Sequence, residues 1–122
     1  MNSSPHFFTG RSGESLAATY LIENGYTVSA KNVRIGHDEI DIVAYDPEDK
    51  VMVFCEVKTR RHLSDDFHPE LNITRLKRYC MARAARHWVE SNGWEGGYRL
   101  DIVCIAAGKV VLHCRDIACE EE

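Results

Sequence analysis

The chain has 122 residues, of which 44% are hydrophobic and 28% charged. This is enough for one hydrophobic core and excludes an intrinsically disordered chain. Its net charge of −4 argues against a protein that coats DNA through charge alone. No apolar run approaches the length of a membrane span and the N-terminus has no signal-peptide pattern, so we expect a cytoplasmic protein without membrane partners.

The hydrophobic periodicity predicts a helix, three strands, a long helix and two further strands. We expect them at about residues 9–24, 26–33, 37–46, 51–59, 72–91, 98–106 and 109–113. Residues 1–8 are predicted to be disordered and residues 117–122 to form an acidic tail, which leaves 9–116 as a single domain.

The connections between these elements predict the topology. The polar turn at 45–50 makes the second and third strands a hairpin, and Ala107-Gly108 does the same for the last two. The long helix then carries the chain across, so that the fourth strand can lie beside the third. The fold class is therefore α/β, with a mixed central sheet and helices on its faces.

Two buried faces are predicted from spacing. Ile40, Ile42 and Ala44 alternate along the second strand and should share its apolar face. The buried stripe of the long helix is expected at Ile73, Leu76, Tyr79, Cys80, Ala84 and Trp88. The five cysteines contain no C-x-x-C pair and are interpreted as small buried hydrophobic residues.

Charged residues interrupt two of the apolar strands. Asp41 lies between Ile40 and Ile42, and Glu56 and Lys58 follow a solidly apolar run in the partner strand. Alternate residues share a face of a strand, so the hairpin should bring these charges together. Like charges repel and burial removes their water, so such a cluster is costly unless a cation binds it.

Each member also has a simpler interpretation. Asp41 could belong to a solvated strand face, and Glu56 with Lys58 could be a surface ion pair. Glu14 lies beside the apolar stripe of the first helix, where it is either a fourth site carboxylate or a first-turn residue that complements the helix dipole. The segment from Lys58 to His87 is net basic although the whole chain is acidic, which suggests either a phosphate track or a solvated helix face.

The combined pattern favours metal-assisted phosphodiester hydrolysis. Magnesium prefers oxygen ligands and takes one or two carboxylates plus water and substrate phosphate, which Asp41 and Glu56 could complete. Lys58 would orient or deprotonate the attacking water, or stabilise developing charge. Contacts to nucleic acid are expected from four residues after or near this motif: Thr59, Arg60, Arg61 and Lys77. For Lys77 a solvated helix face is slightly favoured.

The motif Asp41 … Glu56-Val57-Lys58 resembles that of the PD-(D/E)xK nucleases, which have the restriction-endonuclease-like fold. The wider pattern, over about residues 10–113, resembles the small bacterial YraN-type family, itself similar to Holliday junction resolvases. The matching segments are Gly13-Glu14, Gly25-Tyr26, Asn32-Val33-Arg34, residues 39–44, residues 54–60 and residues 99–103. Asp38 departs from that family, which usually has glycine before the Glu-Ile-Asp run.

The resemblance implies an α-β-β-β-α-β core and a nuclease site. It implies Mg²⁺ or Mn²⁺ as cofactor, with Asp41, Glu56 and Glu14 as metal ligands and with Asp41, Glu56 and Lys58 as catalytic residues. The expected function is thus a metal-dependent endonuclease for DNA, with branched DNA as a substrate suggested by the resemblance. A homodimer would supply the two sites that cutting both strands of a junction needs. The alternatives are a non-catalytic nucleic-acid-binding module of the same fold, and a protein-interaction domain with structural carboxylates.

Overall fold

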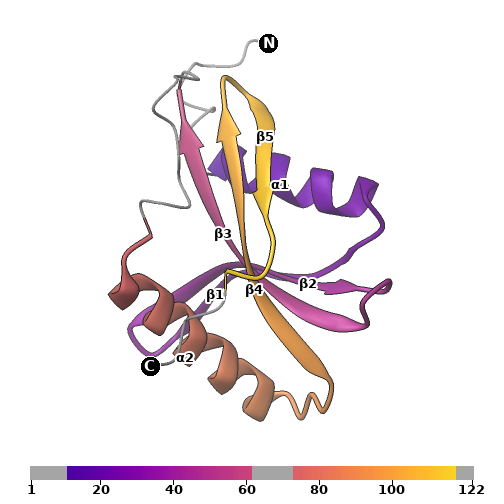
Figure 1. The fold of residues 1–122 in the computed structure, drawn as a ribbon, viewed down its shortest axis with the longest axis vertical. Coiled ribbons are helices and arrows are strands. Elements are labelled where there is room, and N and C mark those ends of the chain that lie inside the picture. The colour runs from indigo at the N-terminus through magenta and orange to yellow at the C-terminus, as the bar shows by residue number, and fades with distance from the viewer. Residues whose placement is uncertain (1–10, 62–72, 118–122) are drawn as a thin grey trace.

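The computed structural model describes residues 11–61 and 73–117, which form two helices and a five-stranded sheet (Figure 1). The elements are α1 (Arg11–Glu23), β1 (Thr27–Ile35), β2 (Asp38–Asp46), β3 (Val51–Arg60), α2 (Arg75–Ser91), β4 (Gly97–Ala106) and β5 (Lys109–Cys114). The predicted order of helices and strands is confirmed. The predictions of disorder at residues 1–8, of a polar loop at residues 62–70 and of most of the acidic tail fall outside the described residues.

The sheet has the strand order β1-β2-β3-β4-β5. β1, β2 and β3 form an antiparallel meander, β4 pairs with β3 in parallel, and β5 returns antiparallel to β4. α2 makes the crossover between the two parallel strands, as a parallel connection requires. β3 therefore lies at the centre of a mixed sheet, which confirms the predicted topology. Within the described residues, neither helix has the length and apolarity needed to cross a membrane.

Local sequence signals explain where the elements end. α1 ends at Gly25, whose φ of 95° is left-handed, and the Tyr26 N–H bonds back to the Leu21 carbonyl. α2 begins after Thr74, whose side chain accepts the Lys77 N–H at 3.0 Å, three residues later than the sequence suggested. Ala107 and Gly108 both have positive φ, which suits the tight turn predicted between β4 and β5.

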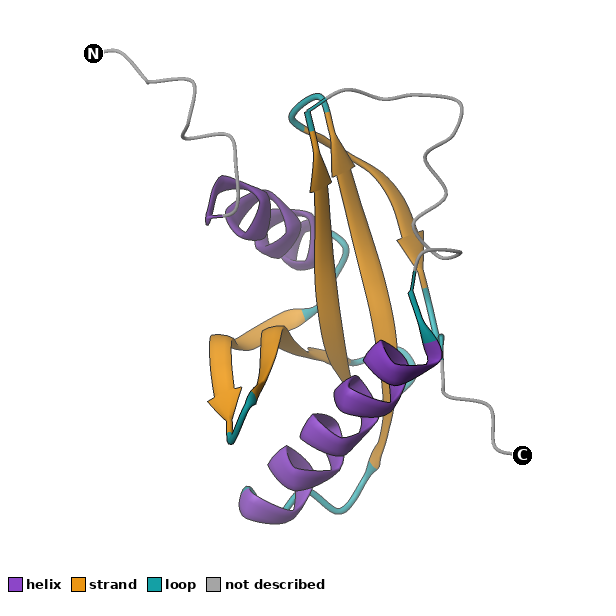
Figure 2. Ribbon diagram, turned by 90° about the vertical axis from the view of Figure 1, so that its left-hand side faces the viewer, coloured by secondary structure: helices purple, strands orange, loops and turns teal. Residues whose placement is uncertain are grey.

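The two helices cover opposite faces of the sheet (Figure 2). α1 packs through Ala17 and Leu21 on one face, where Ile42, Val53 and Val103 are fully buried. Each such fully buried aliphatic side chain contributes about 1.5–3 kcal/mol relative to exposure. This face joins the first helix to the middle of the sheet.

α2 covers the other face with a stripe that differs from the predicted one. Met81, Ala84 and Ala85 are buried against Phe54 and neighbouring core residues. The predicted burial of Ala84 and of Ile73 is confirmed, although Ile73 lies before the helix, and Met81 was not predicted. Leu76 is 70% exposed and Tyr79 is 50% exposed, so their predicted burial is wrong. Leu76 and Tyr79 lie on the side of the helix away from Met81 and Ala85, which face the sheet.

The predicted apolar face of β2 is also wrong at one position. Ile42 and Ala44 pack in the α1 cluster, whereas Ile40 packs with Val43 in the α2 cluster. The β2–β3 ladder ends at Ile42, while the β1–β2 ladder continues beyond it. β2 thus parts from β3 at Asp41, and the simple alternation of faces does not hold across that point.

The C-terminal end of the described chain belongs to the same core. Ile117, which the sequence assigns to the tail, donates its N–H to the Leu100 carbonyl at 2.7 Å and packs against the apolar clusters. The domain therefore includes this residue.

Candidate functional site

Asp41 occupies the point where β2 leaves β3. The last paired residues of this ladder are Ile42 and Cys55, and beyond them the Asp41 carboxylate accepts the Val57 N–H at 2.8 Å. The side chain therefore replaces the strand backbone as acceptor for β3. This bond holds the carboxylate in the fork between the two strands.

Glu56 and Lys58 lie at alternate positions of β3, as the sequence predicted. The Lys58 Nζ is 3.9 Å from a Glu56 carboxylate oxygen, and the side chain of Glu56 is 13% exposed. Lys77 reaches the same carboxylate from α2, with its Nζ at 3.6 Å. Lys77 stays on an exposed part of the helix, with its side chain 41% exposed, and its amine also approaches the cluster.

The electrostatics of this acid–lysine cluster (Asp41, Glu56, Lys58 and Lys77) are unfavourable for two carboxylates. Burial raises the pKa of Asp41, and Glu39 adds to this effect against the Val57 hydrogen bond and the two lysines. Burial also raises the pKa of Glu56, followed by repulsion from Asp41, although both lysines lower it. The lysines thus compensate the two carboxylates incompletely, which is the condition that a bound cation would relieve.

Glu14 approaches the cluster from α1. Burial raises its pKa and the charge of Asp41 raises it further, while a hydrogen bond with Asn32 lowers it. The preceding Gly13 allows this approach, because a Cβ there would collide with the Thr59 hydroxyl at the end of β3. The requirement for glycine therefore comes from close packing of α1 on β3, which brings Glu14 within electrostatic reach of Asp41.

The other predicted nucleic-acid contacts lie around the end of β3. Thr59 faces Gly13 of α1, while Arg60 and Arg61 are exposed at the C-terminal end of the strand. The structure therefore brings Asp41, Glu56 and Lys58 together as predicted, with Glu14 beside them and the arginines beyond.

The donor set agrees with the requirements of magnesium. Among the described residues, no three or more His, Cys, Asp or Glu side chains are grouped to hold a metal ion. Magnesium usually takes only one or two carboxylates and completes its shell with water and phosphate. Asp41 and Glu56 supply two hard oxygen donors whose pKa values are raised mainly by burial, with neighbouring carboxylates adding to the effect. These residues fit Mg²⁺ or Mn²⁺ better than zinc, which favours Cys and His ligands.

A second polar cluster lies under α1 and was largely missed by sequence reasoning. Asp101 is fully buried and accepts hydrogen bonds from Arg99 at 3.0 Å, His113 at 2.8 Å and the Asp116 N–H at 3.0 Å. Arg99 also bonds Asp46 at 2.9 Å. The signal in the sequence was the alternation Arg99-x-Asp101, which places both residues on one face of β4.

This network joins distant parts of the fold. His113 bonds the Tyr20 hydroxyl of α1 at 3.0 Å, and the Tyr26 hydroxyl accepts from Arg99 at 2.7 Å. Burial alone would raise the pKa of Asp101, but hydrogen bonds from His113 and Arg99 hold it below its ordinary value. The network is fully satisfied and connects α1, β4 and β5, so its role is structural.

The fold and the cluster define a mixed α/β domain that gathers two carboxylates and two lysines where two strands of its sheet part. The chain belongs to the uncharacterised protein family UPF0102, whose model matches residues 13–105. The UPF0102 protein of Cytophaga hutchinsonii is 34% identical over 112 residues, which cover 92% of this chain and 96% of that protein. UPF0102 is the YraN-type family that the sequence motifs resemble, so that prediction is confirmed.

Two solved structures are similar in part. A complex of EndoMS with double-stranded DNA has a TM-score of 0.45 and 19% identity, and covers 77% of this chain but 37% of the EndoMS chain. A repair endonuclease from Pyrococcus abyssi has a TM-score of 0.43 and 20% identity, and covers 78% of this chain and 39% of the endonuclease.

Proposed function

We propose that this protein is a metal-dependent endonuclease that hydrolyses phosphodiester bonds in DNA. The observation that carries the proposal is the Asp41 carboxylate fixed by the Val57 N–H, together with the neighbouring Glu56 carboxylate, which two lysine amines approach. A structural ion-pair network would satisfy its charges, as the network around Asp101 does. In this cluster the two lysine amines stay 3.9 and 3.6 Å from Glu56, longer than the contacts around Asp101, and burial raises the pKa of both carboxylates.

Asp41 and Glu56 would hold Mg²⁺ or Mn²⁺, and Glu14 would contribute a further carboxylate directly or through water. When bound, the ion would supply Lewis-acid chemistry that acidifies water and offsets the charge of the scissile phosphate. Asp41 contributes a fixed orientation, because its second oxygen is held by the backbone of β3. Arg60 and Arg61 contribute positive charge at the exposed end of that strand, where phosphates of the substrate could pair with them.

The proposal assigns the action on water to Lys58. Its amine lies beside Glu56, so it can orient the attacking water, accept its proton or stabilise charge on the phosphate. In the reaction the water oxygen forms a new bond to phosphorus, the bond from phosphorus to one sugar oxygen breaks, and that oxygen leaves with a proton. A four-way junction or other branched DNA is the proposed substrate form, with a homodimer providing the second site.

One assay tests the proposal. Labelled four-way junction, flap, single-stranded and duplex DNA are incubated with the protein in Mg²⁺, Mn²⁺ or EDTA. Asp41→Asn and Lys58→Ala should abolish metal-dependent cleavage. The matched controls Glu48→Gln and Lys50→Asn, at the exposed turn at the far end of β3, should retain it. Asparagine suits the positive φ of Lys50. Binding without cleavage in every metal would replace the enzyme by a non-catalytic nucleic-acid-binding module.

A further inference from the structure

One flank of α2 exposes apolar and aromatic side chains next to the acid–lysine cluster. Leu76, Tyr79, Arg83 and His87 recur at helical spacing and form what we call the α2 flank. Leu76 and Tyr79 are 70% and 50% exposed, in a helix that also carries Lys77, the ion-pair partner of Glu56. An exposed leucine and tyrosine on one face are notable because a helix normally buries such residues.

The exposed ring of Tyr79 is held in place. The Arg83 guanidinium lies 5.4 Å from the centroid of this ring, within cation–π range. Arg83 is itself clasped by Asp38 in two hydrogen bonds of 2.9 Å, and this contact holds the pKa of Asp38 below its ordinary value. Asp38, which departs from the family pattern, thus connects the α2 flank to the β1–β2 turn, and Arg83 compensates its negative charge.

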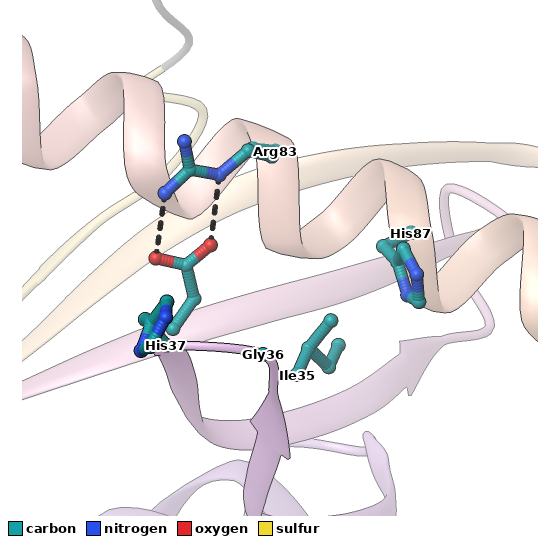
Figure 3. A pocket seen from close by; sticks show the side chains of 6 residues that line it. Ile35, Gly36, His37, Arg83 and His87 are labelled. Carbon is teal, nitrogen blue, oxygen red and sulfur yellow. Dashed lines mark hydrogen bonds and ion pairs between the residues drawn. The ribbon is translucent and has the colours of Figure 1, made fainter.

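A cavity adjoins the flank. It has a volume of about 290 Å³ and lies between the β1–β2 turn and α2, lined by Ile35, Gly36, His37, Asp38, Arg83 and His87. Figure 3 shows Arg83 reaching from the helix to the turn, with His87 further along the same helix and His37 on the turn. Two imidazole rings and a guanidinium plane around an apolar residue are groups on which nucleobases stack.

The charge of α2 indicates the occupant. The helix carries five basic residues, Arg75, Lys77, Arg78, Arg83 and Arg86, and one acidic residue, Glu90, in a chain that is acidic overall. A basic surface that also presents an aromatic ring suits a strand with both phosphates and accessible bases. In a fully paired duplex the bases are stacked inside, so the ring would have no partner. An unpaired strand satisfies both features.

We propose that the α2 flank binds an unpaired segment of the DNA substrate, with a base stacked on Tyr79 and the following strand directed along α2 to the cavity at His87. This deepens the proposed function and rests on it for the identity of the polymer. Lys77 and Arg83 are six residues apart in α2, about 9 Å along the axis, so the segment lies within a few nucleotides of the cluster. Among the branched forms named above, the inferred substrate class is therefore DNA with an unpaired strand beside the cut, such as a flap, and not a fully paired junction.

The test is equilibrium binding in EDTA, which does not depend on cleavage. Fluorescence anisotropy compares a duplex with a single-stranded overhang, a blunt duplex of equal length, and an RNA overhang. Wild type should bind the DNA overhang more tightly than the blunt duplex. Tyr79→Ala should weaken overhang binding by about 5- to 150-fold, the range expected for one stacked base, and leave blunt-duplex binding unchanged. Tyr79→Phe, which keeps the aromatic ring, should bind the overhang as tightly as wild type. Ile22→Ala, at an exposed position of α1, should have no effect.

The outcomes separate this inference from the nuclease proposal. Equal loss on overhang and blunt DNA, no loss with Tyr79→Ala, or no preference for the overhang would overturn the α2 flank even if cleavage is observed. A Tyr79-dependent preference for the overhang without cleavage in any metal would uphold the flank and overturn the nuclease. Tighter binding of the RNA overhang, or no binding of any nucleic acid, would overturn the assignment to DNA. Circular dichroism on each variant checks that the fold is retained.

Discussion

Replacing Glu56 with glutamine is expected to stabilise the metal-free protein. Burial and the charge of Asp41 raise the pKa of Glu56, while Lys77 and Lys58 lower it by less. The ionised side chain is therefore less favourable in the folded chain than in the unfolded chain. A neutral glutamine removes that cost and retains the shape of the side chain.

The size of the effect follows from the approach of Asp41 to β3. The Asp41 carboxylate accepts the Val57 N–H, next to Glu56, and its charge raises the pKa of Glu56. Side chains that meet across neighbouring strands are about 5 Å apart at Cβ, so we take the two charges to be of similar separation. Two unit charges about 6 Å apart repel by about 3 kcal/mol at an effective dielectric of about 20. The two lysines offset about 1 kcal/mol each. We therefore expect a gain of about 1 kcal/mol, or about 4 °C in Tm for a chain of this length.

The assay is thermal unfolding at pH 7, first in EDTA and then with increasing Mg²⁺. Wild type should gain about 3 kcal/mol when the metal reaches about 100 times its Kd, and Glu56→Gln should lose most of that response. Glu90→Gln, an exposed residue near the other end of α2, is the matched control and should behave as wild type. A lower Tm for Glu56→Gln in EDTA, or an undiminished response to Mg²⁺, would refute the electrostatic reasoning.

Three further predictions concern stability. Asp101→Asn should cost about 1.5–3 kcal/mol by denaturant unfolding, because the fully buried carboxylate that accepts from Arg99 and His113 loses its charge, while Arg99 keeps only the carboxylates of Asp46 and Asp49 as ion-pair partners; a loss below 1 kcal/mol would contradict the role given to the network. Gly13→Ala should cost about 1–3 kcal/mol through overpacking against Thr59, and a double-mutant cycle with Thr59→Ala should recover part of it, whereas additive costs would count against this contact. In EDTA, stability should rise as pH falls from 7 through the raised pKa values of Asp41 and Glu56, since protonation removes their penalty. It should then fall below about pH 3.8 as Asp101, whose pKa is lowered, becomes protonated. If stability instead falls continuously as the pH is lowered from 7, the predicted stabilisation by protonation of Asp41 and Glu56 is wrong.

The central motif could be predicted from sequence because its signal is local. Two charged residues after an apolar strand share a face by the two-residue period, and a short turn returns the partner strand beside them. Asp41, Glu56 and Lys58 are therefore placed by neighbouring residues alone. The order of the elements has the same origin, since each helix or strand is encoded by its own periodicity and stop signals.

The features that the sequence did not predict depend on contacts between distant segments. Leu76 and Met81 are both apolar, and helical spacing alone does not decide which of them faces the sheet; that follows from the crossover that places α2 over Phe54. Lys77 lies at the edge of the buried stripe, so its approach to Glu56 could not be distinguished from a solvated position. The network around Asp101 required β4, β5 and α1 to meet, and no single segment contains that information.

Asp41 links the fold to the candidate site, because one oxygen of its carboxylate completes the backbone of β3. An unsatisfied backbone N–H at this depth costs about 1–3 kcal/mol, so alanine at this position would lose both the acceptor and the charge. Asparagine keeps the acceptor and removes the charge. If Asp41 serves the fold alone, the Asp41→Asn variant should have the same unfolding stability and the same Mg²⁺ binding as wild type. If Asp41 also holds a cation, the variant should be at least as stable as wild type in EDTA and should lose its stabilisation by Mg²⁺. The comparison of these two substitutions therefore separates a structural acceptor from a ligand within a single residue.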